Sequence, residues 1–147
     1  MTADTRQRFS DAWESLFRTT RRLRARAGRL PGEAHMSVPQ YHLLEPLRTG
    51  GELPVGELAE AAGVAAPTAT RMLDCLARDG YITRRHAEHD RRSVLVGLTP
   101  EGEQALEIAH RHVEAWRGRV LDRLEPEERE QAAVIMERLS QVVAEEL

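Results

Sequence analysis

The chain has 147 residues, of which 21 are basic, 24 are acidic and 41% are hydrophobic, and its formal net charge is −3. This length and composition suit one globular domain that is richer in helix than in sheet, and they argue against a disordered chain. No apolar run approaches the roughly 20 residues that a membrane span needs, and the N-terminus lacks a signal-peptide core. With a single cysteine, and so no intramolecular disulfide, the sequence predicts a cytoplasmic protein without a membrane partner.

The charge is unevenly distributed along the chain. Residues 1–35 carry 8 arginines against 4 acidic residues, whereas residues 101–147 carry 6 against 12. All the basic residues are arginine, because the sequence contains no lysine. We therefore expect a nucleic acid to meet the first two-thirds of the chain, with the acidic last third facing away from it.

The first predicted element is a long amphipathic helix over residues 5–28, because apolar side chains recur there at steps of three and four. Gly28, Pro31 and Gly32 are expected to end it. The arginines between Arg18 and Arg29 surround the apolar stripe, which favours a solvated helix face over a DNA-contacting arm. The stripe consists of Phe9, Trp13, Leu16, Phe17, Thr20, Leu23 and Ala27.

Two shorter helices are predicted next. The first begins at Ser37 or Val38 with a proline in its first turn, and Pro46 should kink it by removing one hydrogen bond. The second runs over residues 55–62 and ends at Gly63, which suits a left-handed terminal residue.

A further helix over about residues 67–78 has the features of a DNA recognition helix. Its first two turns carry Thr68, Thr70 and Arg71, which are small or able to contact a guanine and which fit the major groove. An ordinary amphipathic helix with a polar outer face is the alternative. We expect Met72, Leu73 and Leu76 to form the inner face, and we expect Cys75 to be a buried structural thiol rather than a redox sensor.

A hairpin wing is predicted from two short strands, Tyr81 to Arg84 and Val94 to Leu98, joined by a polar loop. Four arginines in and beside this loop face only Glu88 and Asp90, so the loop can meet a phosphate backbone or a narrow minor groove. We expect Asp90 to hold the Arg92 side chain in one rotamer by pairing with it.

Two C-terminal helices complete the chain. The first starts at Thr99 as a hydroxyl cap followed by Pro100, and the second starts at Pro126. Their apolar stripes, and that of the first helix, indicate packing on a second copy of the chain; the alternative is packing on the central module alone. We therefore divide the single domain, 1–147, into an N-terminal dimerisation helix at 1–35, a DNA-binding lobe at 36–100 and C-terminal dimerisation helices at 101–147.

The sequence LPVGELAEAAGVAAPTATRMLDCLARDGYITRR, followed by HDRRSVLVGLTPEG, resembles the MarR family of bacterial transcriptional regulators. The signature is an Asp-Arg-Arg wing that leads into an alternating strand and Leu-Thr-x-x-Gly, and the resemblance covers roughly residues 35–105. It implies a mostly helical winged helix-turn-helix fold, a two-fold homodimer joined by the terminal helices, and an operator-binding repressor that is relieved by a small ligand, oxidation or a metal.

The resemblance assigns DNA-contacting roles by position. Thr68, Thr70 and Arg71 match the groove-facing start of the recognition helix, and Asp90 and Arg92 match the wing aspartate and minor-groove arginine. Three further wing positions usually meet phosphate in the family: Arg84, Arg85 and Arg91. One departure concerns Ala65 and Ala66, because the family often has Ser or Thr at this helix cap, whose side chain stabilises a helix by about 1 kcal/mol.

The ligand-sensing residues are less well defined. The family's pocket lies between the dimer helices and the DNA-binding lobe, and the matching candidates are Trp13, Phe17, Tyr41 and His42, each of which also suits a core position. Zinc-sensing members of the family led us to examine four histidines, and only His110, with a glutamate one turn away, has spacing suitable for a metal pair. We predict no metal site and no cofactor. The histidines considered are His35, His42, His110 and His112.

Together these features predict a sequence-specific DNA-binding regulator that represses transcription as a homodimer and responds to an unidentified small molecule. An enzyme is not expected, because the chain has no glycine-rich phosphate loop, no nucleophile beside a histidine and no paired carboxylates in an identifiable cleft. Two alternatives remain: a zinc-type metal-responsive regulator of the same fold, and a winged-helix protein-interaction module without specific DNA binding.

Overall fold

The structure is a computed structural model that describes residues 3–26, 35–90 and 92–146. The chain divides into two compact units, Met1–His110 and Arg111–Leu147. In chain order the elements are α1 (Ala3–Arg26), α2 (Val38–Leu44), the 3-10 helix η1 (Glu45–Thr49), β1 (Glu52–Pro54), α3 (Val55–Ala62), α4 (Ala66–Arg78), β2 (Ile82–His86), β3 (Val94–Leu98), α5 (Pro100–Leu121) and α6 (Pro126–Glu145). This combination of helices and a small sheet confirms the predicted fold class.

The second helix is shorter than the sequence suggested. Ser37 caps α2: its hydroxyl accepts from the Gln40 backbone N–H at 3.3 Å, while the Gln40 side chain accepts from the Ser37 N–H at 2.8 Å. The α-helix ends at Leu44, and the segment that contains Pro46 continues as the tighter η1. The predicted kink is therefore a change of helix type, which accommodates a proline that cannot donate to the α-helical ladder.

Helices α3 and α4 form the predicted helix pair. Gly63 ends α3 with a φ of 62°, a left-handed conformation that glycine adopts without steric cost. Ala65 is the N-cap of α4, and no side chain caps this helix, as the sequence predicted. The buried face of α4 consists of Ala69, Leu73 and Leu76, whereas Met72 is half-buried.

The expectation of a buried Cys75 was wrong, because this thiol is exposed. A helix turns by about 100° per residue. Cys75 is therefore rotated away from the face that its neighbour Leu76 shares with Leu73.

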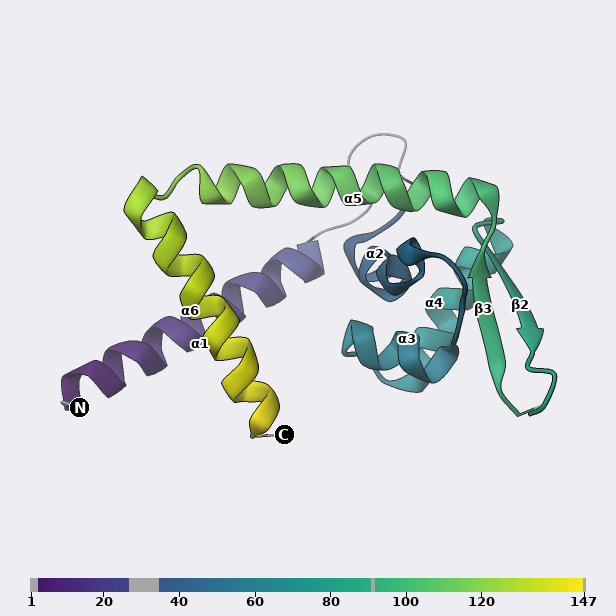
Figure 1. Ribbon diagram of the computed structural model, residues 1–147, viewed down its shortest axis with the longest axis horizontal. Coiled ribbons are helices and arrows are strands. Elements are labelled where there is room, and N and C mark those ends of the chain that lie inside the picture. Colours follow the sequence, from purple (N-terminus) through teal and green to yellow (C-terminus); the bar gives the residue numbers. More distant parts are fainter. Residues whose placement is uncertain (1–2, 27–34, 91, 147) are drawn as a thin grey trace. The chain divides into compact units, whose positions relative to one another are not determined.

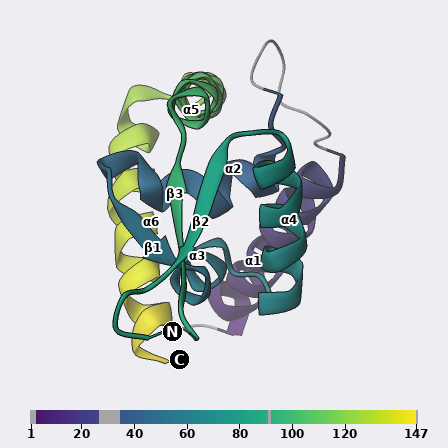
Figure 2. The same cartoon turned by 90° about the vertical axis from the view of Figure 1, so that its right-hand side faces the viewer.

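The wing belongs to a three-stranded antiparallel sheet of order β1-β3-β2. The register places Arg84 opposite Val96 and Arg85 opposite Leu95. Figure 2 shows β2 and β3 running side by side, with α4 next to β2. The sequence did not predict β1, which has only three residues and lies directly before α3.

Hydrogen bonds connect the residue before α5, Thr99, to the turn that follows α4. The Thr99 hydroxyl donates to the Gly80 carbonyl at 2.6 Å and accepts from the Gly102 N–H at 3.0 Å. The Thr99 N–H donates to the Tyr81 carbonyl at 3.0 Å. A Cβ on Gly102 would lie only 1.9 Å from that same Tyr81 oxygen, which explains why the Leu-Thr-x-x-Gly signature ends in glycine.

Within the first unit, α2, α3 and α4 gather beside the sheet, and the β2–β3 hairpin extends past them (Figure 1). The first part of α5 belongs to the same unit: the Tyr41 hydroxyl and His110 Nδ1 form a 2.9 Å hydrogen bond, and Arg48 lies 3.8 Å from Glu107. The lobe core consists of Met36, Tyr41, Leu43, Leu44, Leu47, Leu58, Ala59, Ala69, Leu73, Leu76, Ile82, Val96, Ala105, Leu106 and Ala109. The first compact unit therefore includes the part of α5 that ends at His110.

Large apolar side chains are exposed on α1, on the second part of α5 and on α6. On α1, the Trp13 ring contacts the tilted rings of Phe9 and Phe17, with centroids 5.6 and 4.9 Å away. The residues predicted to end this helix, Gly28, Pro31 and Gly32, lie outside the described residues. None of the helices in the described part of the chain is long and apolar enough to cross a membrane. The exposed set is Phe9, Leu16, Phe17, Leu23, Trp116, Val120, Leu121, Val134, Ile135, Met136, Val142 and Val143.

Candidate nucleic-acid interface

The first two turns of α4 present the predicted polar face to solvent. Thr68, Thr70 and Arg71 are all exposed there. The Thr70 hydroxyl donates to the Ala66 carbonyl at 2.9 Å. That hydrogen is therefore engaged, so the exposed side chain of Thr70 suits contact with a thymine methyl better than donation of a hydrogen bond to a phosphate.

Arg84 is joined to α4 rather than extended into solvent. Its Nη1 donates to Asp74 Oδ1 at 2.7 Å, and its Nη2 donates to the Thr70 carbonyl at 3.3 Å. The Arg84 side chain is 29% exposed. Ile82, two residues earlier on the same face of β2, is buried. Arg84 therefore lies at the edge of the contact between the wing sheet and α4.

Arg85 points to the opposite face of β2, because side chains alternate along a strand. Its Nε donates to both carboxylate oxygens of Glu52, at 2.9 and 2.8 Å, and its Nη2 donates to Oε2 at 2.5 Å. These hydrogen bonds are the main reason why the pKa of Glu52 is lowered and the pKa of Arg85 is raised. In this structure Arg85 is thus paired within the sheet and separated from the α4 side.

Asp90 shapes the loop of the wing through the backbone. Its carboxylate accepts from the Arg92 N–H at 2.9 Å, and its carbonyl accepts from the Ser93 N–H at 3.0 Å. The sequence led us to expect pairing with the Arg92 guanidinium, but the contact that the structure shows is an Asx turn, which an aspartate forms with the backbone two residues on. Arg91 lies outside the described residues.

A hollow of about 380 Å³ opens between α3, α4 and the wing. Thr70 lines it from α4, Arg84 lines it from β2, and Arg92 and Ser93 line it from the loop directly before β3. The remaining lining residues are Pro54, Val55, Gly56 and Val94. The structure therefore brings Thr70, Arg84 and Arg92 together at one surface, as a DNA-reading module requires.

Two acidic residues of this region were missed in the sequence. Asp74 and Glu52 hold Arg84 and Arg85, at separations of 10 and 33 residues in the chain. Each looks like an ordinary solvated side chain in the sequence, because a partner on another element leaves no periodic signal. The number of arginines in the wing sequence therefore overestimated the positive charge that is available to bind DNA.

The candidate effector residues fall into two pairs on different helices. Tyr41 and His42 are neighbours on α2 with an edge-on ring contact, and Tyr41 is only 1% exposed, so it belongs to the core. Trp13 and Phe17 contact each other on α1. Among the described residues, no group of three or more His, Cys, Asp and Glu side chains is placed to hold a metal ion.

Comparisons with known proteins agree with this geometry. A sequence model of the MarR family matches residues 36–94. The regulator YfiV of Bacillus subtilis, described as an uncharacterized HTH-type transcriptional regulator, is 36% identical over 95 residues, which are 65% of this chain. The match spans about three-fifths, 59%, of the length of YfiV.

Solved structures extend the similarity over nearly the whole chain. The crystal structure of YusO from Bacillus subtilis is 31% identical with a TM-score of 0.63, and the match covers 96% of this chain and 99% of YusO. MepR of S. aureus, crystallised as a MepR–DNA complex, is 25% identical with a TM-score of 0.73, covering 88% of this chain and 97% of MepR. By these matches and by its fold, the chain belongs to the MarR family of winged helix-turn-helix transcriptional regulators, a class without enzymatic activity.

Proposed function

We propose that this chain binds a pseudo-palindromic DNA operator as a homodimer and represses transcription. The observation that carries the proposal is the surface where the exposed start of α4 and the arginine-bearing hollow beside the wing meet. A helix start with small polar residues fits the major groove, and an arginine on a hairpin at its side reaches the adjacent backbone or minor groove. The MepR–DNA complex supports this assignment by similarity.

The residues that we assign to the DNA differ in role. Arg71 is exposed, and its guanidinium makes no hydrogen bond or ion pair among the described residues, so it is available for a bidentate contact to guanine. The Arg92 guanidinium is likewise without such a partner in the described part of the chain. Thr68 and Thr70 supply short-range contacts beside Arg71. Asp90 acts indirectly, by fixing the turn that carries Arg92.

Dimerisation through the terminal helices is the second part of the proposal. Each of α1, the second part of α5 and α6 exposes apolar side chains that a monomer would leave in water. Exposed apolar side chains of this kind on a helix are typical of an interface between subunits. A two-fold dimer would present two α4 helices to half-sites about 10 base pairs apart.

A small-molecule effector is the third part. A ligand can shift the equilibrium between two geometries of a dimer only by binding one of them more tightly than the other. Trp13, Phe17 and His42 are the proposed contacts, whereas Tyr41 is 1% exposed and lies in the core. We place the protein in the cytoplasm, where such an effector and the operator would meet.

The proposal is tested by measuring binding to DNA upstream of the chain's own gene and to a scrambled duplex of equal length, at several salt concentrations. We expect preferential binding that weakens steeply with salt, because arginine–phosphate contacts release counterions. Equal affinity for the two duplexes would rule out operator recognition. It would favour the alternative of a winged helix used only for protein contacts.

A metal-responsive regulator of the same fold is distinguished by repeating the measurement with a chelator and with added zinc. The ligand-responsive proposal expects unchanged operator affinity in both arms. A zinc-dependent change of tenfold or more, corresponding to about 1.4 kcal/mol, would transfer the assignment to the metal-responsive class.

A further inference from the structure

Arg84 connects the wing to the recognition helix at two points. Its guanidinium donates to the Asp74 carboxylate at 2.7 Å and to the Thr70 carbonyl at 3.3 Å. These two acceptors lie one turn apart on α4. A planar guanidinium with donors in a fixed fork holds two such acceptors in a defined orientation, which a flexible ammonium group does not.

The side of α4 that Arg84 contacts is continuous with the surface proposed to face DNA. Thr70, whose carbonyl accepts from Arg84, is exposed beside Arg71. The same hollow is lined by Thr70, Arg84 and Arg92. A rotation of α4 relative to β2 would therefore move the groove-facing side chains relative to the wing arginine.

The charges around Arg84 distinguish two possible roles for it, a ligand of DNA phosphate and a residue that positions α4. A phosphate ligand needs a cation that is free to meet it, and here the Arg84 charge is already offset by Asp74. A phosphate at this position would also meet the Asp74 carboxylate, which repels it. Asp74 is 52% exposed and Arg84 29%, so the pair is open enough to solvent that its own contribution to stability is small.

We propose that Arg84 is a positioning residue that sets the orientation of α4 relative to the wing through Asp74 and Thr70, rather than a ligand of the DNA backbone. The inference rests on the proposed operator binding. It changes the role that the family resemblance gave to Arg84, and it makes Asp74, an acidic residue beside DNA, a contributor to specific binding.

The test uses the full chain and a duplex that the wild-type protein selects from a random-sequence pool, compared with a scrambled duplex. Arg84→Gln and Asp74→Asn should each lower the operator-to-scrambled affinity ratio, by about two- to fivefold. The double variant should fall no further than either single variant, because both substitutions remove one contact. The salt dependence of operator binding should stay that of the wild type.

A phosphate ligand gives the opposite pattern. Arg84→Gln would then weaken operator and scrambled DNA equally and reduce the slope of log affinity against log salt by about 0.9. Asp74→Asn would leave the ratio unchanged or strengthen binding to both duplexes. Either result overturns the proposal.

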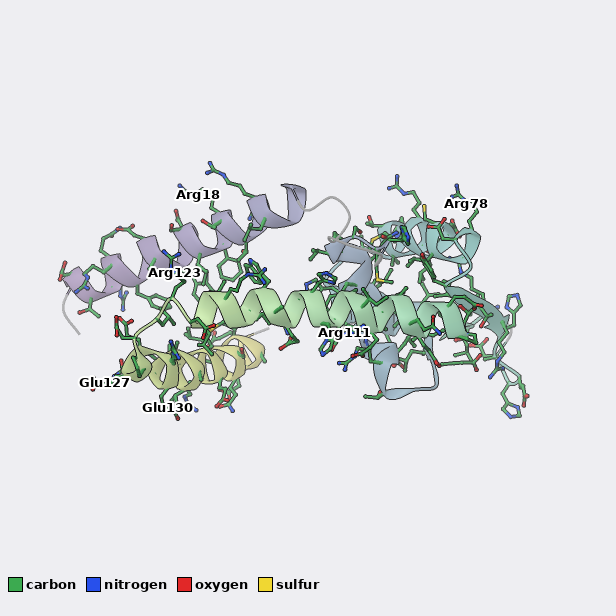
Figure 3. The ribbon with its side chains drawn as sticks, turned by 90° about the horizontal axis from the view of Figure 1, so that it is seen from above. Arg18, Arg78, Arg111, Arg123, Glu127 and Glu130 are labelled. Atoms are coloured by element: carbon green, nitrogen blue, oxygen red, sulfur yellow. The ribbon has the colours of Figure 1, made fainter. Side chains whose placement is uncertain are left out.

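Matched controls separate positioning from general charge or folding effects. Arg78→Gln removes one arginine from the same helix, where the side chain projects outward (Figure 3), and Asp79→Asn removes one acid from the helix end. Neither control should change the affinity ratio. If Arg84→Gln lowers the melting temperature, Arg84→Lys is the second variant, because it keeps the charge but not the planar fork of donors. If Arg84 is a positioning residue, Arg84→Lys should still lower the operator-to-scrambled affinity ratio. If only a cation is needed, the ratio should stay that of the wild type.

Failure of the proposed function remains distinguishable from failure of this inference. If the wild-type chain enriches no sequence from the pool, operator recognition fails, and the role of Arg84 fails with it. If the wild type does select an operator and the Arg84 and Asp74 variants keep the full affinity ratio, only the positioning role is wrong.

Discussion

Glu52 and Arg85 lie on the two outer strands of the wing sheet and form a bidentate ion pair across Gly97 of the middle strand. A Cβ on Gly97 would lie 3.1 Å from Glu52 Cγ, so the missing side chain leaves the room in which Glu52 crosses β3. The pair ties β1, directly before the helix pair, to the strand that carries Arg84. The wing is therefore held to the lobe on both faces of β2.

The Glu52–Arg85 pair predicts a pH-dependent stability. The pKa of Glu52 is lowered in the folded chain, chiefly by hydrogen bonds from Arg85. Its contribution is therefore present above the ordinary glutamate pKa of about 4.3 and is lost as pH falls through the lower folded value. Glu52→Gln should lower the melting temperature at pH 7, and the difference should shrink below about pH 4. Glu60→Gln, at an exposed site on α3, serves as the control; a difference from wild type that is the same at both pH values would contradict this account.

Gly102 predicts a strong steric effect at the start of α5. Gly102→Ala would place a Cβ 1.9 Å from the Tyr81 carbonyl oxygen. Backbone on both sides must then move, and we expect a loss of about 1–3 kcal/mol in the free energy of unfolding, measured with urea. Gly56→Ala has open space around the new Cβ and should be neutral or stabilising. Equal stability of the two variants would show that the contact relaxes without cost.

The uncapped start of α4 can be improved. Ala65→Ser would supply a side-chain oxygen as a second acceptor for the Thr68 N–H, which now donates to the Ala65 carbonyl at 2.9 Å without a side-chain cap. We expect about 1 kcal/mol of added stability and slower amide exchange at Thr68 to Thr70. Ala66→Ser, one residue inside the helix, should give neither effect. Slow exchange at these amides in the wild type would instead show that the end of α4 is already fixed without a cap.

Arg71 and Arg92 should contribute to binding in different ways. Arg71→Ala removes a proposed base contact, so it should cost about 1–3 kcal/mol on the operator and relax preference at one base position. Arg92→Ala should weaken binding several-fold through the wing, with the preference at that position retained. Anisotropy titrations with single-base variants of the operator separate these outcomes. If Arg71→Ala weakened all of these duplexes equally, Arg71 would be a backbone contact.

Exposed apolar residues on α6 predict a change of oligomeric state. Ile135→Arg would put a charge among apolar side chains that we assign to the dimer, so sedimentation should show dissociation at concentrations where the wild type is dimeric. Glu130→Arg is the control, because Glu130 projects outward from α6 (Figure 3). An unchanged dimer in Ile135→Arg would place the interface elsewhere.

Local rules account for most of the elements. The Ser37 cap, the left-handed Gly63, the proline in the first turn of α5 and the missing cap at Ala65 all depend on residues within a few positions of one another, and each was predicted. Four features were not predicted correctly: β1, the type of helix at Pro46, the exposure of Cys75 and the contact between Asp90 and Arg92. A strand of three residues has too few positions for a periodic pattern, and the exposure of one thiol depends on which way its helix is rotated against the core.

The sequence by itself determined the family, the helix pair, the arginine-rich hairpin and the positions of Thr68, Thr70 and Arg71, because these follow from periodicity, turn chemistry and a contiguous signature. Only the tertiary structure decided which partners Arg84 and Arg85 have. Arg84 and Arg85 are adjacent in the chain, but strand alternation sends one to Asp74 on α4 and the other to Glu52 on β1. Those partners are distant in sequence, so the charge left free for DNA is set by the fold and not by the count of arginines.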